Sequence, residues 1–302
     1  MRINWRLGAP LAVVMFAAAC GAGTATAQGH PNSSATAAAA ASRSSPGASH
    51  PAGHTSGHRA SAGSATSAPA GAQDSSASRP LAGKTIGIDP GHNGRNKDDP
   101  TFINHQIWNG REWEACDTTG TETDGGYTEA RFNFNVASYL RADLRKLGAR
   151  VVFTRPGNNG VGPCVNRRAR ILNRAHSNLA IDIHADGGPA SGRGFTVLEP
   201  VADGPNNHVI KSSIRFGSDV RSAMLKYTRM PTSDYYGHNG VIFRNDLAGL
   251  NLATEPKILI ETGNMRNATD ARLLVQTWFQ KRIAVALAHA MLRFLTGRWG
   301  HV

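Results

Sequence analysis

Large apolar side chains are missing from a long stretch near the start of this 302-residue chain. Between Gln28 and Pro80 there is no Ile, Leu, Val, Met, Phe, Tyr or Trp, and Ala, Ser, Gly, Thr and Pro dominate. Such a segment cannot bury enough apolar surface to offset its chain entropy, so we expect a disordered tether over residues 28–80. Its flexible Ala- and Gly-rich surroundings preorganise no metal site around its four histidines, which are His30, His50, His54 and His58.

The chain also lacks a continuous apolar run of the roughly 20 residues that a membrane-spanning helix needs. Residues 1–27 instead combine Arg2 and Arg6 with a short apolar stretch and the small residues Ala25-Thr26-Ala27. This pattern is typical of a secretory signal peptide. The alternative cleavage, before Cys20, would leave a lipid-anchored cysteine, although the residue three positions earlier is Ala17 rather than leucine. We therefore expect an exported protein without a transmembrane segment.

Cysteine is scarce, with three in the whole chain. Cleavage after Ala27 leaves only Cys116 and Cys164, and two cysteines in an exported protein most simply form a disulfide. By the chain-entropy model this bridge would stabilise the fold by about 4 kcal/mol. It would also connect the long loop around Cys116 to the segment that starts at Cys164. Two free thiols are the alternative.

Acidic residues are few compared with basic ones, 21 against 33, which gives a formal net charge of +12. A nucleic-acid partner would be one explanation, but the chain has no zinc-finger spacing, no RNA-binding signature and no basic run interleaved with aromatic residues after the tether. Outside a cell membrane, a basic protein meets anionic cell-wall polymers and lipid headgroups. The charge therefore favours an anionic cell-wall surface over nucleic acid, and we expect a monomer.

The remaining residues, 81–298, predict one α/β domain. Short apolar runs end at turn residues, and one helix places Val136, Leu140 and Leu144 on one face, with Thr128 as N-cap and Gly148 as the stop. The order of these elements predicts a mostly parallel twisted sheet with helices on both faces. Predicted strands are Lys84–Asp89, Ala149–Arg155, Leu179–Asp186, Gly194–Pro200 and Lys257–Glu261, and predicted helices are about 128–147, 165–177, 210–228 and 270–296.

Two further expectations concern the surface and an irregular region. In the helix "VNRRARILNRAHS" we expect the arginines to face outward around an apolar stripe of Ile171 and Leu172. The stretch 230–251, "MPTSDYYGHNGVIFRNDLAGLN", is expected to be irregular.

Residues that could bind or use a metal follow three of the predicted strands. His92 comes after the first strand, His184 lies in the third, and Glu261 ends the strand "KILIE". Glu129 begins the helix after the first long loop. Ligands of open parallel sheets collect beyond the carboxyl ends of the strands, so topology brings these four residues to one edge. Two imidazoles and one carboxylate around an open position form a known catalytic zinc arrangement, which leaves a second carboxylate to move protons.

Each residue also has a simpler interpretation. Taken alone, His92 could be a solvated histidine in a turn. Glu129 could simply lie in the first turn of its helix, where a negative charge interacts favourably with the helix dipole. His184 and Glu261 are harder to dismiss, because each follows an apolar run where a polar group is costly without a partner or a task. Together the four residues favour a zinc site with His92, Glu129 and His184 as ligands and Glu261 as general base and acid.

Four segments resemble the AmiC-like catalytic domain of zinc-dependent N-acetylmuramoyl-L-alanine amidases. They are "IGIDPGHNG", "YTEARFNFNVA", "LAIDIHAD" and "ILIETGNMRN", and the resemblance covers about Lys84 to Leu295. It implies one Zn²⁺ per chain, held by His92, Glu129 and His184, with Glu261 as the catalytic glutamate. It also implies cleavage of the amide between the lactyl group of N-acetylmuramic acid and L-alanine of the peptidoglycan stem peptide, in the periplasm or at the cell wall. Such an enzyme would serve wall turnover, remodelling or daughter-cell separation.

Other residues have a weaker assignment. Asn267 matches an asparagine that commonly follows the glutamate segment of this family and would help shape the pocket. Asp89 would orient a histidine ligand or simply form the turn, and His105, His238 and Asp186 could support or replace a ligand. The chain departs from the family in its long loop, 93–128, and in having only a tether where relatives often carry a wall-binding module. A catalytically silent wall-binding protein and a zinc peptidase that cuts the stem peptide are the competing functions.

Overall fold

A computed structural model describes residues 79–302 of the chain. The expected signal peptide, the alternative lipid attachment at Cys20 and nearly all of the expected tether lie outside the described residues. Within residues 79–302, no helix has the length and apolar character that crossing a membrane requires.

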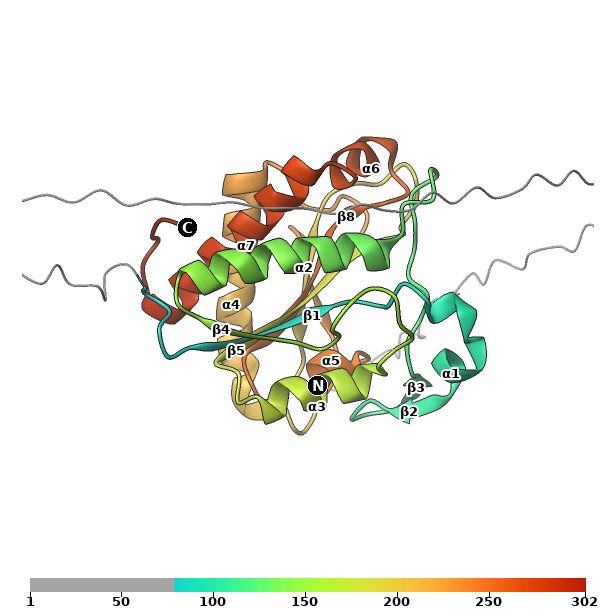
Figure 1. Cartoon of the computed structure of the whole chain (residues 1–302), viewed down its shortest axis with the longest axis horizontal. Coiled ribbons are helices and arrows are strands. Elements are labelled where there is room, and N and C mark those ends of the chain that lie inside the picture. Colours follow the sequence, from blue (N-terminus) through green and yellow to red (C-terminus); the bar gives the residue numbers. More distant parts are fainter. Residues whose placement is uncertain (1–78) are drawn as a thin grey trace, which may run out of the picture. The chain divides into compact units, whose positions relative to one another are not determined.

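A six-stranded sheet forms the centre of the domain (Figure 1). Its order is β4-β1-β5-β8-β6-β7. Neighbouring strands are parallel except for β6 and β8, which are antiparallel. The predicted α/β fold with a mostly parallel sheet is therefore confirmed. The strands are β1 (Thr85–Pro90), β4 (Arg150–Phe153), β5 (Leu179–Asp186), β6 (Thr196–Pro200), β7 (Val241–Arg244) and β8 (Lys257–Asn264).

Helices cover both faces of this sheet, α2 and α7 on one side and α3 and α5 on the other (Figure 1). The core on the first face joins Val136 of α2, Phe216 of α4 and Leu287 of α7. A 3-10 turn, η2 (Asn207–Val209), leads into α4, and a π-helical turn, η3 (Met224–Thr228), follows it. The helices are α2 (Glu129–Lys146), α3 (Val165–Arg174), α4 (Ile210–Ala223), α5 (Ala248–Asn251), α6 (Ala268–Leu274) and α7 (Thr277–Thr296).

The alternation of side chains along β1 explains how the two faces are packed. Ile86 and Ile88 are fully buried in the large core beneath α2. Gly87 points to the other face, where a Cβ would lie 3.0 Å from a methyl group of Leu172 in α3. This close approach lets α3 pack directly on the sheet, so β1 is covered on both sides, as a central parallel strand must be.

Three element predictions differ from the structure. The stretch expected to be irregular contains β7, an edge strand whose four residues pair with β6. β8 continues past Glu261 to Asn264: the register shifts by one extra residue in β8, after which Asp186 pairs with Asn264. The single last helix is in fact α6 and α7, separated at Gln276, whose backbone is extended (φ −83°, ψ 123°).

The expectation that the arginines of α3 all face outward was wrong for Arg168. Its side chain is 1% exposed. Its position is explained by two buried carboxylates, Asp89 and Asp117, which lie within 2.9 Å of its guanidinium nitrogens. Charge pairing thus overrides the usual preference of arginine for solvent.

The long loop between β1 and α2 is an ordered subdomain at the carboxyl end of β1 (Figure 1). It contains the 3-10 turn η1 (Asn96–Asp98), α1 (Pro100–Asn104) and a hairpin of β2 (Gln106–Trp108) and β3 (Trp113–Ala115). A disulfide joins Cys116, directly after β3, to Cys164, directly before α3. The expected attachment of this loop to the Cys164 segment is therefore present in the structure.

Candidate metal centre

Topology brings the four candidate residues to one edge of the sheet. β1, β5 and β8 are adjacent and parallel, so the residues at their carboxyl ends lie side by side. His184 and Glu261 are register partners on β5 and β8. His92 lies two residues beyond β1, and Glu129 is the first residue of α2.

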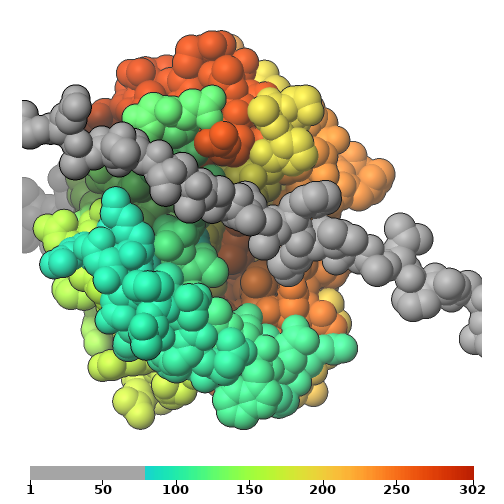
Figure 2. All heavy atoms as spheres, turned by 90° about the vertical axis from the view of Figure 1, so that its right-hand side faces the viewer, coloured from blue at the N-terminus to red at the C-terminus, as the bar shows by residue number. Residues whose placement is uncertain are grey.

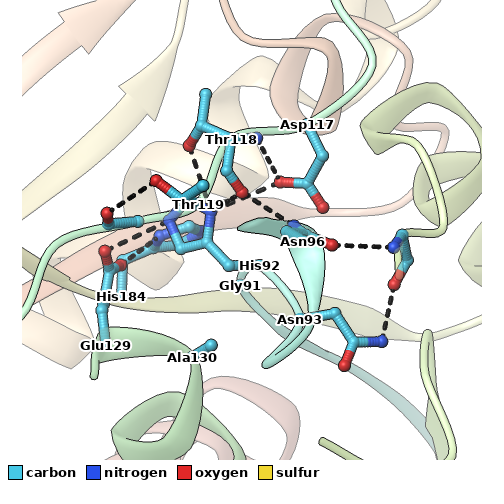
Figure 3. A network of polar contacts seen from close by, with 12 residues as sticks. Gly91, His92, Asn93, Asn96, Asp117, Thr118, Thr119, Glu129, Ala130 and His184 are labelled. Atoms are coloured by element: carbon cyan, nitrogen blue, oxygen red, sulfur yellow. Dashed lines mark hydrogen bonds and ion pairs between the residues drawn. The ribbon is translucent and has the colours of Figure 1, made fainter. Parts of the chain in front are cut away.

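Three of these residues converge on one point (Figure 3). Glu129 Oε2 lies 3.2 Å from His92 Nε2, and Glu129 Oε1 lies 2.8 Å from His184 Nδ1. The two imidazole rings meet edge to face, with centroids 4.9 Å apart. One nitrogen from each histidine and one oxygen from Glu129 all lie within 4.8 Å of one another. This cluster is the arrangement of two nitrogens and one oxygen that the sequence predicted.

The Glu129 carboxylate is fixed by neighbouring donors. The backbone N–H groups of Thr121 and Ala185 donate to its two oxygens at 3.0 and 3.3 Å. The Asn133 side chain, one turn later on α2, donates to Oε1 at 3.2 Å. Burial alone would raise the pKa of Glu129, but the two imidazoles outweigh burial and lower it well below its usual range. Glu129 is therefore held as an anion that faces both histidines.

Glycines at two positions make room for the ligands. A Cβ on Gly91 would lie 2.2 Å from His184 Nε2, so the imidazole can pack only against a bare backbone there. A Cβ on Gly120 would lie 2.7 Å from Glu129 Oε2 and from the ring of His92, and the φ of Gly120 is +74°. These close approaches explain the glycine that precedes His92 in "DPGH".

His92 has a left-handed backbone (φ 57°), which is uncommon for a residue other than glycine. Its Nδ1 faces Asp117 Oδ1 at 3.3 Å and the backbone oxygen of Thr118 at 3.2 Å, while Nε2 faces Glu129 (Figure 3). Burial disfavours the charged imidazole, but Glu129 and Asp117 outweigh burial and raise the pKa of His92 to about 10. The carboxylates therefore favour a positive charge at this position, which a metal ion can supply.

Arg168 connects His92 to two buried carboxylates through hydrogen bonds. It donates to Asp89 Oδ1, to Asp117 Oδ2 and to the backbone oxygen of His92, each at 2.8–2.9 Å. Burial would raise the pKa of Asp117, but Arg168 and His92 lower it to about 2. Asp89 is thus one contact removed from His92 and also accepts a hydrogen bond from Thr154. Its proposed role in orienting a histidine would act through Arg168.

Glu261 lies across from the ligand cluster, and its Oε2 is a buried oxygen with no hydrogen-bond partner in the described part of the chain. Burial raises its pKa well above the usual range, and the negative charges of Glu129 and Asp186 add to this effect. A buried carboxyl group with a free oxygen and a raised pKa is suited to accept and donate protons.

The four residues share a cleft of about 410 Å³ that opens at this edge of the sheet. One wall comes from the loop 93–128 and the other from residues 236–247 (Figure 2). Past His92 and His184 a second cavity, of about 190 Å³, extends toward α3 and α5. The cleft wall after residue 235 includes Tyr236 and Arg244, which the sequence analysis did not identify.

The remaining predicted residues lie in different places. Asn267 is the N-cap of α6, where its oxygen accepts from the N–H groups of Thr269 and Asp270 and its amide donates to Ala190. Its proposed effect on the pocket would be indirect, through the loop at Ala190. Asp186 lines the cleft and accepts a hydrogen bond from Tyr235. His105 lies beside the disulfide, and His238 is exposed.

Two further residues of the site, Asp117 and Arg168, were not predicted from the sequence. Asp117 follows Cys116 directly, so the predicted disulfide already indicated that this part of the loop is held in place. Arg168 shares a helical face with Leu172, four residues later, and this spacing was the available sign that it points toward the sheet.

The donor set fits Zn²⁺. Tetrahedral zinc is commonly bound by histidine nitrogens and a carboxylate oxygen, and a catalytic site leaves its fourth position open. Here two imidazole nitrogens and one carboxylate oxygen converge, and Glu261 lines the same cleft.

The chain is similar to known proteins over most of the described domain. Residues 86–293 match the family model described as N-acetylmuramoyl-L-alanine amidase. An N-acetylmuramoyl-L-alanine amidase of Mycobacterium tuberculosis is 39% identical over an alignment of 222 residues that covers 71% of this chain and 88% of that protein. The crystal structure of the amidase Ami1 from Mycobacterium smegmatis is 36% identical with a TM-score of 0.68, over 72% of this chain and 99% of the other. The apo form of Ami1 from Mycobacterium abscessus is 38% identical with a TM-score of 0.67, over 72% and 100%. The chain therefore belongs to the N-acetylmuramoyl-L-alanine amidases, a family of peptidoglycan hydrolases.

Proposed function

We propose that this chain is a zinc-dependent amidase that cleaves the bond between the lactyl group of N-acetylmuramic acid and L-alanine of the stem peptide. His92, Glu129 and His184 would hold one Zn²⁺, and Glu261 would act as general base and acid. The observation that carries this proposal is the convergence of three ligand atoms within 4.8 Å in the cleft that Glu261 also lines.

The bound metal would supply a Lewis acid that polarises the scissile carbonyl and lowers the pKa of water toward neutrality. The chain's own residues supply orientation and proton transfer. Asp117, with Nδ1 of His92 as its donor, fixes the ring so that Nε2 faces the metal position. Gly91 and Gly120 leave the space in which the ligands can approach each other.

Glu261 is suited to both proton transfers. Its carboxyl group lines the cleft and can accept a proton from the attacking water. Because burial raises its pKa, the carboxyl group can keep that proton until the amide nitrogen departs. Donation to the alanine nitrogen then yields a neutral amine and returns Glu261 to its starting form.

The surroundings of the enzyme follow from its substrate and charge. Peptidoglycan lies outside the cytoplasmic membrane, and the formal net charge of +12 favours contact with anionic wall polymers. We propose that residues 1–27 direct export, that residues 28–80 form a tether, and that the catalytic domain works as a monomer in the periplasm or at the wall.

Digestion of purified muropeptides, with and without a metal chelator, tests this function. Mass spectrometry should find intact stem peptides with a free L-alanine amine, and the chelator should abolish them. Glu261→Ala should keep zinc by elemental analysis and lose activity by several orders of magnitude, whereas Glu112→Ala, at an exposed turn, should behave as wild type. Cleavage within the stem peptide would instead identify a peptidase. Turnover by Glu261→Ala would show that Glu261 is not the general base and acid.

A further inference from the structure

Tyr236 and Arg244 form a hydrogen-bonded pair in the wall of the amidase cleft. Arg244 Nη1 donates to the Tyr236 hydroxyl oxygen. The same guanidinium donates through Nε and Nη2 to the two oxygens of Asp246, at 2.6 Å for Nε. Both residues line the cavity that contains His92, Glu129, His184 and Glu261. Of the described residues that line this cleft, Arg244 is the only arginine or lysine.

The pair is held rigidly. The Tyr236 ring packs against Leu198, Leu250 and Leu259. Its backbone oxygen accepts from Thr196 Oγ1 at 3.0 Å, and its backbone N–H donates to Ser233 Oγ at 3.0 Å. A side chain fixed at both ends loses little entropy when it binds a ligand, so its hydroxyl is a prepared contact.

The hydroxyl hydrogen of Tyr236 is not used by Arg244, because the oxygen is the acceptor in that contact. The neighbouring tyrosine shows the contrast. Tyr235 donates its own hydroxyl hydrogen to Asp186 at 2.7 Å. Burial raises the pKa of Tyr236, so its hydroxyl keeps the hydrogen at neutral pH. Arg244 also retains two of its five N–H donors after its contacts with Asp246 and Tyr236.

The order of the strands shows which part of a substrate would meet this pair. His184 and Glu261 are register partners on β5 and β8, and Glu261 pairs in turn with Thr196 at the start of the antiparallel β6. Because Thr196 Oγ1 donates to the backbone oxygen of Tyr236, His184, Glu261 and Tyr236 follow one another along the edge. Arg244 pairs with Pro200, away from this edge, and its side chain reaches Tyr236 and the cleft. The scissile carbonyl must lie on the side of the histidines, where the metal would be. Because Glu261 must reach the departing nitrogen, the peptide that continues from this nitrogen points toward Tyr236 and Arg244.

We propose that Tyr236, polarised and positioned by Arg244, binds an oxygen of the stem peptide on the leaving-group side of the scissile bond, a carbonyl or carboxylate oxygen beyond the alanine nitrogen. This inference rests on the proposed amidase function. The contact is made in substrate and transition state alike, so it contributes to substrate affinity rather than to the chemical step.

Two substrates with the same scissile bond test the proposal. One is N-acetylmuramoyl-L-alanine extended to a dipeptide, and the other is the N-ethylamide of N-acetylmuramic acid, which has no oxygen on the leaving-group side. Tyr236→Phe should raise KM about tenfold for the dipeptide substrate with kcat nearly unchanged, which corresponds to one lost hydrogen bond. For the ethylamide, both constants should stay at wild-type values. Tyr227→Phe is the matched control, since Tyr227 stacks on His289 away from the cleft.

Equal effects of Tyr236→Phe on both substrates, or no effect on either, would overturn the proposal. A fall in kcat at constant KM would also overturn it, because this result would place the hydroxyl at the developing oxyanion. If the wild-type protein cleaves neither substrate, the amidase function itself fails. Equilibrium binding then still decides the inference: in a Glu261→Gln background, Tyr236→Phe should raise the Kd for the dipeptide substrate about tenfold and leave the Kd for the ethylamide unchanged.

Arg244→Gln tests the positioning role of the arginine. It should raise KM for the dipeptide substrate in the same way as Tyr236→Phe, and the double variant should be no worse than the more impaired single variant, because the two residues act as a unit. Additive losses would show that Arg244 does not act through Tyr236.

Discussion

Gly91 lies directly against the imidazole of His184, so close that a Cβ at residue 91 would come within 2.2 Å of Nε2. The turn after β1 and the ligand on β5 therefore depend on each other. Pro90 ends the strand, Gly91 leaves space for the neighbouring ligand, and His92 provides a ligand of its own. The short segment "DPGH" thus serves two histidines rather than one.

Gly91→Ala should consequently displace His184 and lower the zinc content of the purified protein. The added methyl group contacts the ring itself, and the ring carries the nitrogen that must face Glu129 at 2.8 Å. Elemental analysis after dialysis measures the effect, and circular dichroism checks that the fold is retained. Gly157→Ala is the control, because a Cβ there meets nothing within 4 Å. Full zinc occupancy in Gly91→Ala would contradict the expected clash.

Asp117 should determine how tightly the metal is held, although it does not face the metal position. Its carboxylate orients His92 through Nδ1, and removal of such an orienting group typically lowers metal affinity about 10- to 100-fold. We expect Asp117→Asn to show a loss of this size in competition with a chromophoric chelator. Asp143→Asn, which breaks only the surface pair with Lys146, should leave the affinity unchanged. An unaltered affinity in Asp117→Asn would mean that the Thr118 oxygen alone orients the ring.

Arg168 should be important for stability as well as for the site. Arg168→Met would leave Asp89 and Asp117 buried without their partner, a change that typically lowers the free energy of unfolding by about 3–5 kcal/mol. Urea unfolding followed by tryptophan fluorescence measures this quantity. If the loss is below about 1 kcal/mol, the two carboxylates must find other partners or become protonated.

The sequence was sufficient to predict the parallel sheet and to indicate four candidate site residues that the fold brings together, because both follow from local signals. Apolar runs that end at Pro90 or in "IHAD" mark strand ends, and strand ends of a parallel sheet share an edge. β7 escaped prediction because an edge strand of four residues, with Phe243 exposed, has neither the apolar run nor the clear alternation of a central strand.

The pairing of Arg168 was missed for a different reason, since its partners are distant in the sequence: Asp89 lies 79 residues before Arg168. An arginine on a helix normally faces water, and only the folded structure shows that two carboxylates lie on the buried side of this helix. The spacing from Leu172 indicates the buried face of the helix, but it does not indicate which carboxylates lie there. Tyr236 and Arg244 lie in the stretch that was expected to be irregular, where no strand end marked a site residue.

The disulfide should support the site as well as the fold. It joins residues separated by 48 positions, and by the chain-entropy model its loss should lower the free energy of unfolding by about 4 kcal/mol. Because Cys116 directly precedes Asp117, we expect the double variant Cys116→Ser, Cys164→Ser to bind zinc more weakly at a temperature where it remains folded. Chelator competition and urea unfolding measure the two effects. A lower free energy of unfolding with unchanged zinc affinity would show that the disulfide stabilises the fold without supporting the metal centre.

Glu199 of β6 should make stability depend on pH in a way that can be isolated. It is buried, a Cβ on Gly217 of α4 would lie 2.2 Å from its Oε1, and burial raises its pKa from 4.5 to about 7. Below pH 4.5 this carboxyl group is protonated in both the folded and unfolded protein, so it contributes no pH dependence. Between pH 4.5 and 7 only the unfolded chain ionises readily, so the free energy of unfolding falls as the pH rises.

Glu199→Gln removes this ionisation and keeps the size of the side chain. Relative to wild type, the variant should therefore gain about 1 kcal/mol in free energy of unfolding between pH 4.5 and 7, after allowance for solvent screening. Above pH 7 this difference should stay constant. Urea unfolding at a series of pH values measures it, with Glu112→Gln at an exposed position as the control. A difference that does not change with pH would show that Glu199 ionises normally in the folded protein, and that burial beneath α4 does not disfavour its charge.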